Sequence, residues 1–196
     1  MSRSGDEPAP RSRGRGALSP ATLRHVLLVV VAGAVVGALL GVLWQWAWTP
    51  PTGAAWKGKW YLDPDGVGQD VASTGWFTLI GLVGGIAYGS LAGRLGLRRP
   101  LATLVGVAVG SFVVAYVMYQ VGHVLGPPDP RAAARTADDW EPIVSDLRLA
   151  GVDHPMRPFS LESGAVVAPG IGALVGLVGI FIGGSGPSRG RSGAHD

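Results

Sequence analysis

Four long apolar runs constrain this chain more than any other feature of its sequence. The first, "VLLVVVAGAVVGALLGVLWQWAW", occupies residues 26–48, and Gln45 is its only strongly polar side chain. A helix of about 20 apolar residues crosses the ~30 Å hydrocarbon core of a bilayer. Similar runs predict four spans, at about residues 26–48, 76–93, 101–125 and 163–183. Four such helices in 196 residues leave too little polar surface to cover them in water, so we predict a membrane domain over residues 24–184.

The composition excludes several other classes of protein. Charged residues make up 15% of the chain, against about 25% in ordinary proteins. The Lys and Arg residues are scattered between apolar runs, so we predict no nucleic-acid partner. The absence of cysteine excludes disulfides, zinc–cysteine sites and thiol nucleophiles. The first apolar run is longer than the ~7–15 residues of a signal peptide, and no small-residue cleavage site follows it, so we expect an uncleaved helix.

The basic residues predict the orientation of the spans. Arginines cluster before the first span and between the second and third, at Arg3, Arg11, Arg13, Arg15, Arg24, Arg94, Arg98 and Arg99. Most acidic residues fall in the other two loops, 49–75 and 126–162. Because basic loops stay in the cytoplasm, we expect a multi-pass protein of the inner (plasma) membrane with a disordered tail at 1–23 and a second tail at 185–196, both cytoplasmic. Cysteines placed at Ser73 and Ser145 should then react from outside.

Tryptophans gather where the first span ends. Tryptophan prefers the layer in which membrane meets water, because its ring is amphipathic. At 100° per residue, alternate tryptophans spread over several faces of a helix and form a girdle. We therefore predict four interfacial residues that contact the lipid bilayer: Trp44, Trp46, Trp48 and Trp76.

The segment after this first span has the signals of a small extracytoplasmic cap. Pro50 and Pro51 end the helix. The sequence "DPDG" at 63–66 suits a type I turn, and we predict a β-hairpin around it, with Ser73 or Thr74 capping the second span. A cradle for a headgroup or a sugar is the alternative reading of this segment, built from Lys57, Lys59, Trp60, Asp63 and Asp65.

Glycines recur at intervals of four within the spans. Such glycines share one face of a helix and allow two backbones to approach closely inside a membrane. We predict ten packing residues: Gly33, Gly37, Gly41, Gly81, Gly85, Gly89, Gly106, Gly110, Gly172 and Gly176. The pattern favours a tight four-helix bundle, and it leaves open whether some faces meet another membrane protein or a second copy of the chain. A phosphate-binding loop is excluded, because no GK[ST] follows the glycines.

Pro169 lies inside the fourth predicted span. A proline within a helix removes one hydrogen bond and clashes with the preceding turn. We therefore expect a kink in the fourth helix near Ala165.

The sequence gives little sign of catalytic chemistry. No ionisable residue lies at the middle of a span, which argues against a proton-coupled transporter. In the second outer loop, Asp129 and Pro130 begin a short surface helix, and "IVSDLRL" is read as a possible second one. Acidic residues there, with His123 and His154, lack any metal-binding or hydrolase spacing. We predict no catalytic residue, no metal and no cofactor.

Three stretches together resemble a known family. They are "WQWAWTPP" with the hairpin after it, "GHVLGPPDP" at the end of the third span, and "RPFSLESGAVVAP" before the fourth. The chain resembles a family of small four-span actinobacterial membrane proteins classed as a domain of unknown function. The resemblance implies the same topology and adds no functional residue.

The sequence as a whole predicts an all-α membrane protein: a four-transmembrane-helix bundle with a small cap formed by a β-hairpin and short helices. The predicted function is that of a non-catalytic accessory or scaffold protein of the cell envelope. An oligomeric transporter or channel component is the alternative, and an envelope enzyme that uses the outer carboxylates is the third possibility. A polar lumen lined by Gln45, Tyr119, Gln120 and His123 would favour the transporter.

Overall fold

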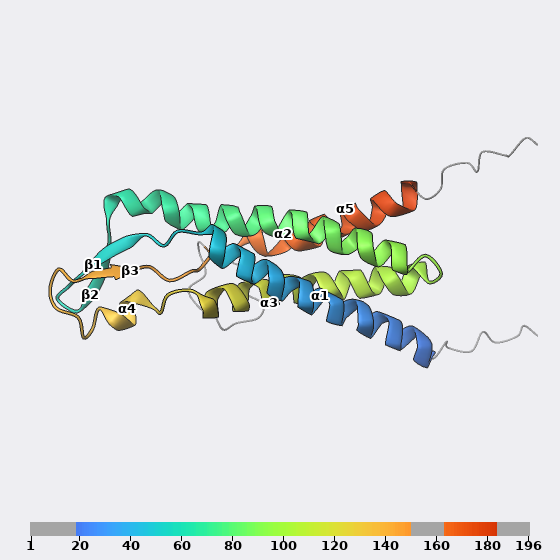
Figure 1. Cartoon of the computed structure of the whole chain (residues 1–196), viewed down its shortest axis with the longest axis horizontal. Helices are drawn as coiled ribbons and strands as arrows, with labels where there is room; N and C mark the ends of the chain where they lie inside the picture. The colour runs from blue at the N-terminus through green and yellow to red at the C-terminus, as the bar shows by residue number, and fades with distance from the viewer. Residues whose placement is uncertain (1–18, 150–162, 184–196) are drawn as a thin grey trace, which may run out of the picture.

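The computed structural model describes residues 19–149 and 163–183, and this part of the chain is mostly helical. Figure 1 shows the long helices side by side in an elongated body, with a small sheet at one end. They are α1 (Pro20–Ala47), α2 (Val67–Leu95), α3 (Pro100–Leu125) and α5 (Ala168–Gly183). With the 3₁₀ segment η2 (Gly164–Val167) before α5, each is long and apolar enough to cross a membrane. Most of both predicted tails lies outside the described residues.

Local sequence signals explain where these helices begin and end. Ser19 caps α1 by accepting a hydrogen bond from the Thr22 amide, and Pro20 takes the first helical position, where proline is tolerated. Pro50 and Pro51 prevent α1 from continuing. A proline also begins α3, after a turn at residues 96–99 that Gly96 opens.

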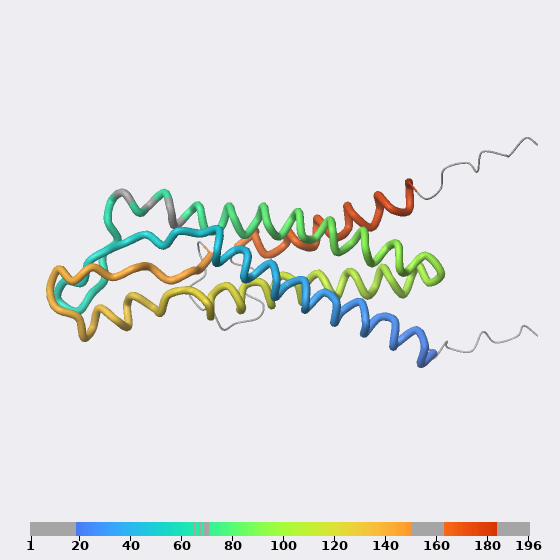
Figure 2. Tube along the Cα trace, viewed as in Figure 1, coloured from blue at the N-terminus to red at the C-terminus, as the bar shows by residue number. Residues whose placement is uncertain are grey.

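The four helices form two parallel pairs. α1 packs mainly against α3, and α2 packs mainly against α5. Within each pair the contacts advance in the same direction along both helices, as Gly33 lies against Gly110 and Gly37 against Val114. Figure 2 shows why: the chain reverses direction after each helix, so that α1 and α3 run one way and α2 and α5 the other. Alternate helices, and not consecutive ones, therefore make the closest contacts.

Along α1, the glycines face inward and most large apolar residues face outward. Gly33, Gly37 and Gly41 are buried on α1, whereas the opposite face is exposed and apolar. That exposed face includes Leu27, Val31, Val35 and Leu39. A soluble bundle has the reverse arrangement, with its large apolar residues inside. The outer surface therefore fits lipid better than water.

The cap contains a three-stranded sheet, in which a third strand pairs with a β-hairpin. Its strands are β1 (Thr52–Trp56), β2 (Lys59–Leu62) and β3 (Pro142–Val144). β1 is central and pairs antiparallel with both neighbours; Trp56 lies opposite Lys59 and Thr52 opposite Val144. The short helix α4 (Pro130–Ala133) completes the cap, and Asp129 caps it as predicted, accepting a hydrogen bond from the Arg131 amide.

The predicted position of the hairpin turn was wrong. The chain reverses at Lys57 and Gly58, which both have positive φ angles, 50° and 70°. Two consecutive residues of this kind form the type I′ turn that matches the twist of a hairpin. The "DPDG" stretch instead forms a 3₁₀ turn, η1 (Pro64–Gly66), that leads directly into α2.

Two further predictions about the cap were wrong, the first because helix α2 starts earlier than its apolar run. Gly66, not Ser73 or Thr74, occupies the N-cap of α2. Ser73 lies inside the helix and is buried. The "IVSDLRL" segment is not helical, because its first residues form β3 and residues 145–149 continue as an irregular segment.

Candidate functional site

The closest helix–helix contacts in the bundle occur at the predicted packing glycines. On α1, a Cβ added to Gly37 would lie 2.7 Å from the Val114 carbonyl oxygen, and one on Gly41 would lie 2.6 Å from that of Met118. Real Cβ atoms essentially never lie so close to another heavy atom. Gly33 meets Gly110 in the same way, at 3.0 Å. These three glycines therefore set the spacing between α1 and α3.

The contact between α2 and α5 is reciprocal. A Cβ on Gly85 or Gly89 would overlap the Pro169 or the Ala173 carbonyl oxygen, and Gly81 faces the Pro169 ring. From the other side, a Cβ on Gly172 or Gly176 would overlap the Leu82 or the Ile86 carbonyl oxygen. Each helix thus presents its glycines to the backbone of the other, which is the geometry that four-residue glycine spacing favours in membranes.

Tyr88 connects this pair to the other one. Its buried hydroxyl donates a hydrogen bond of 3.0 Å to the Val29 carbonyl oxygen on α1. It passes so close to Gly110 on α3 that a side chain there would collide with it. The remaining predicted glycine, Gly106, lies against Val29, with 3.1 Å from an added Cβ to the Val29 side chain. The ten predicted packing glycines therefore all contact another helix of the same chain.

The prediction of a tryptophan girdle was wrong for two of its four members. The Trp44 and Trp48 side chains are 0% and 6% exposed and belong to the core beneath the cap. Trp46 is 80% exposed and Trp76 is also exposed, as an interfacial residue requires. The difference arises because Trp44 packs edge-on against Phe77 of α2, with 5.0 Å between ring centres, and covers Gly122 of α3.

Pro169 does not kink the middle of a helix. It is the second residue of α5, where its missing N–H costs no helical hydrogen bond. The 3₁₀ segment η2 precedes α5 and contains Ala165, the expected position of the kink. The chain thus accommodates the proline by changing helix type, and the buried proline ring packs against Gly81.

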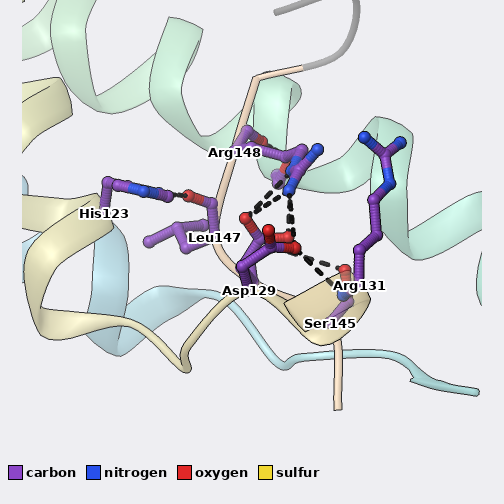
Figure 3. Close-up of polar contacts among 8 residues, drawn as sticks. His123, Asp129, Arg131, Ser145, Leu147 and Arg148 are labelled. Carbon is purple, nitrogen blue, oxygen red and sulfur yellow. Dashed lines mark hydrogen bonds and ion pairs between the residues drawn. The ribbon is translucent and has the colours of Figure 1, made fainter. Parts of the chain in front are cut away.

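A polar cluster joins the cap to the bundle. We call Trp44, Ser73, His123, Asp146 and Arg148 the junction cluster. The Trp44 indole donates to the Ser73 carbonyl oxygen at 2.8 Å, and the Ser73 hydroxyl donates to the Arg148 carbonyl oxygen at 2.7 Å. His123 donates from Nδ1 to the Leu147 carbonyl oxygen at 2.7 Å (Figure 3). Residues from α2 and α3 therefore bond directly to the segment 145–149, and Trp44 of α1 is bonded to Ser73.

The charged part of the junction cluster is an ion pair between the partly buried Arg148 and the buried Asp146. Arg148 meets the Asp146 carboxylate at two points, Nε to Oδ1 at 2.9 Å and a terminal nitrogen to Oδ2 at 2.6 Å. It also lies 3.7 Å from Asp129 at the start of α4, toward which it extends in Figure 3. Burial by itself lowers the pKa of Arg148, but Asp146 and then Asp129 raise it, so that the net pKa lies above its usual value. The guanidinium thus stays charged and acts as a structural clamp.

The apolar side chains of the same segment close the end of the bundle. Leu147 and Leu149 are fully buried and pack with Trp44, Phe77, Met118 and Tyr119. Tyr119 stacks on His123, with 5.9 Å between ring centres, and its buried hydroxyl has no hydrogen-bond partner in the described part of the chain. A buried hydroxyl without a partner costs about 1–3 kcal/mol. This is the one buried side-chain polar atom, among the described residues, that the fold leaves unpaired.

Sequence reasoning missed this segment, although a signal was present. In "SDLRL" the polar residues Asp146 and Arg148 alternate with Leu147 and Leu149. Alternation with a period of two is typical of an extended chain with one buried face. The leucines enter the core and the charged pair faces the cap.

No group of three or more histidine and carboxylate side chains among the described residues could hold a metal ion. His123 is bonded to a backbone carbonyl, and His154 lies outside the described residues. Asp146 and Asp129 are both engaged by Arg148. The junction cluster therefore has the geometry of a structural contact between the cap and the helices, in which each charged group is already paired.

Comparisons with protein-family models, with curated proteins and with solved structures find no match for this chain. The resemblance to an actinobacterial family therefore stays a prediction, and the function has to be argued from the residues themselves.

Proposed function

We propose that this chain is a multi-pass protein of the plasma membrane that acts as a non-catalytic accessory or scaffold, with both termini in the cytoplasm and its cap outside. The observation that carries this proposal is that glycine contacts and two clusters of buried apolar side chains fill the interior of the described bundle. Glycine contacts bring the helix backbones together, and Leu147 and Leu149 cover the end beneath the cap. A filled bundle supports a protein that holds a shape and presents a surface.

The cap offers the surface that such a role needs. Trp56, Tyr61 and Trp140 form an exposed aromatic patch, with 6.2 Å from the Trp56 ring centre to each of the others. Trp140 is 72% exposed although its backbone has a φ of 71°, a conformation that costs a non-glycine residue about 1–2 kcal/mol. Exposed aromatic patches are typical of protein interaction sites. The ten packing glycines are used within the chain, so a partner would have to contact a different surface, such as this patch.

A transporter or channel component is the second candidate, and one observation favours it. The unpaired Tyr119 hydroxyl lies at the cap end of the bundle, near Gln120 and His123 in sequence. A buried polar atom without a partner in the described residues is a position where water or a solute can bind. Leu147 and Leu149, which close the cap end of the bundle, argue against an open path for a solute.

The two candidate functions predict different ion permeabilities for liposomes that contain the protein. We expect purified protein reconstituted in liposomes to pass K⁺, Na⁺ and protons no faster than protein-free liposomes do, as measured with entrapped ion-sensitive dyes. The matched variant is Tyr119→Phe, which removes only the unpaired hydroxyl. Flux above background in the natural protein that falls in Tyr119→Phe would replace the scaffold proposal with the transporter.

The scaffold proposal also predicts a specific neighbour at the cap. A photo-crosslinking residue at Trp140 should give a discrete adduct with one other protein in living cells, while the same residue at the lipid-facing position Val35 should not. Absence of any adduct at the aromatic patch would contradict the proposal.

A further inference from the structure

The described acidic side chains are confined to one end of the bundle. The acidic side chains described by the structure belong to the cap or to its junction with the helices: Asp63, Asp129, Asp138, Asp139, Glu141 and Asp146. The opposite end contains the start of α1, the end of α2 and the turn before α3 (Figure 1). Four exposed arginines occur there: Arg24, Arg94, Arg98 and Arg99.

Hydrogen bonds join two of the segments that carry these arginines. His25, the neighbour of Arg24, is hydrogen-bonded through Nε2 to the Thr103 hydroxyl at 3.0 Å. The same hydroxyl lies 3.1 Å from the Arg99 carbonyl oxygen and 3.3 Å from that of Gly96. The start of α1 is thereby fixed against the α2–α3 turn, which carries Arg98 and Arg99.

The arginines have no carboxylate partner among the described residues, whose ion pairs both involve Arg148. Like charges at one end of a bundle repel one another, and a bound anion relieves this repulsion. The helices are apolar enough to cross a membrane, so this end lies at the level of a headgroup layer. Phosphate is the anion that such a layer supplies, and guanidinium groups recognise it well.

Apolar side chains lie beside the arginines. Leu23, Leu97 and Leu101 are all exposed at the same end, next in sequence to Arg24, Arg98 and the α3 start. A free phosphate ion makes no apolar contact with these leucines, whereas the acyl chains of a phospholipid can pack against them. We propose that this end binds an anionic phospholipid, with its phosphate on Arg24, Arg98 and Arg99, and that the lipid stabilises the contact between α1 and the α2–α3 turn.

The test measures thermal unfolding of the full-length protein in a non-ionic detergent, followed by tryptophan fluorescence, during a titration with lipid. Phosphatidylglycerol should raise the Tm, whereas phosphatidylcholine with the same acyl chains and inorganic phosphate should not. In the variant R98Q/R99Q the phosphatidylglycerol concentration that gives half of this rise should increase about 30-fold, which corresponds to about 1 kcal/mol for each arginine.

Two further variants keep the test specific. R131Q/R135Q removes two exposed arginines from the cap and should retain the response of the natural protein. R98K/R99K keeps the charge and should also retain it, and its folding can be compared with that of R98Q/R99Q without lipid. An unchanged response in R98Q/R99Q, an equal loss in R131Q/R135Q, or a rise produced by inorganic phosphate alone would each overturn the proposal.

Discussion

Replacing Gly89 with leucine is expected to destabilise the protein by about 3 kcal/mol, the upper end of the usual cost of overpacking. A Cβ at this position already overlaps the Ala173 carbonyl oxygen on α5, and a leucine adds three more carbon atoms. The obstacle is backbone and not a flexible side chain, so α2 and α5 would have to separate. The free energy of unfolding in detergent, obtained by steric trapping or by denaturant titration, measures the effect.

Gly75→Leu is the matched control for this prediction. Gly75 lies on the same helix, and a Cβ there meets nothing within 4 Å. Leucine is a better helix former than glycine by about 0.5–1 kcal/mol, so this variant should be neutral or more stable. Val83→Leu, at an exposed position that is already bulky, should change little. If Gly89→Leu is as stable as Gly75→Leu, then α2 and α5 do not pack through their glycines.

The second large effect is expected from Arg148→Met, at about 3–5 kcal/mol of lost stability. The Asp146 side chain is only 2% exposed, and this change leaves its carboxylate buried without its cation. Ser73 and His123 donate their hydrogen bonds to backbone carbonyl oxygens of this segment, so both bonds survive the substitution. The loss therefore reports on the ion pair and can be measured by the same unfolding experiment.

A double-mutant cycle separates the ion pair from simple packing. Asp146→Asn combined with Arg148→Met removes both charges, so it should cost much less than the sum of the two single changes. Additive losses would show that the two side chains do not stabilise each other. A cost below about 1 kcal/mol for Arg148→Met would mean that the pair behaves like an ordinary surface salt bridge.

The positions of the long helices followed from the sequence because they depend on local composition. The predicted third span, 101–125, differs from α3 by one residue at its start. The predicted second span, 76–93, was shorter than α2, which begins at Val67. The first two turns of α2 include polar residues and give little hydropathy signal. A helix can extend beyond its apolar run, and a search for apolar runs does not detect this.

The partners of these elements could not be predicted, since they depend on contacts between distant residues. Four-residue glycine spacing identifies a packing face but not the helix that it meets; consecutive helices were as plausible as the observed pairs α1–α3 and α2–α5. Trp44 and Trp48 were misread for the same reason. A tryptophan at the end of a span suits the headgroup layer or a core beneath a cap, and only the position of Leu147 and Leu149 decides between them.

The same limit affected the choice of accessible positions. Ser73 and Ser145 were expected to be exposed in the outer loops, but both are buried, at 1% and 3%. Cysteines there would be protected from a reagent for structural reasons, whichever side of the membrane they occupy. Thr136 in the cap and Leu97 in the α2–α3 turn are exposed and replace them.

Labelling of single cysteines at these two positions tests the central claim, a four-span protein with its cap on the outer side. The natural chain has no cysteine, so Thr136→Cys and Leu97→Cys each carry a single thiol. In intact cells, a membrane-impermeant maleimide should label position 136 and leave position 97 unlabelled until the membrane is opened with detergent. Labelling of position 97 in intact cells, or of both positions to the same extent, would contradict the account.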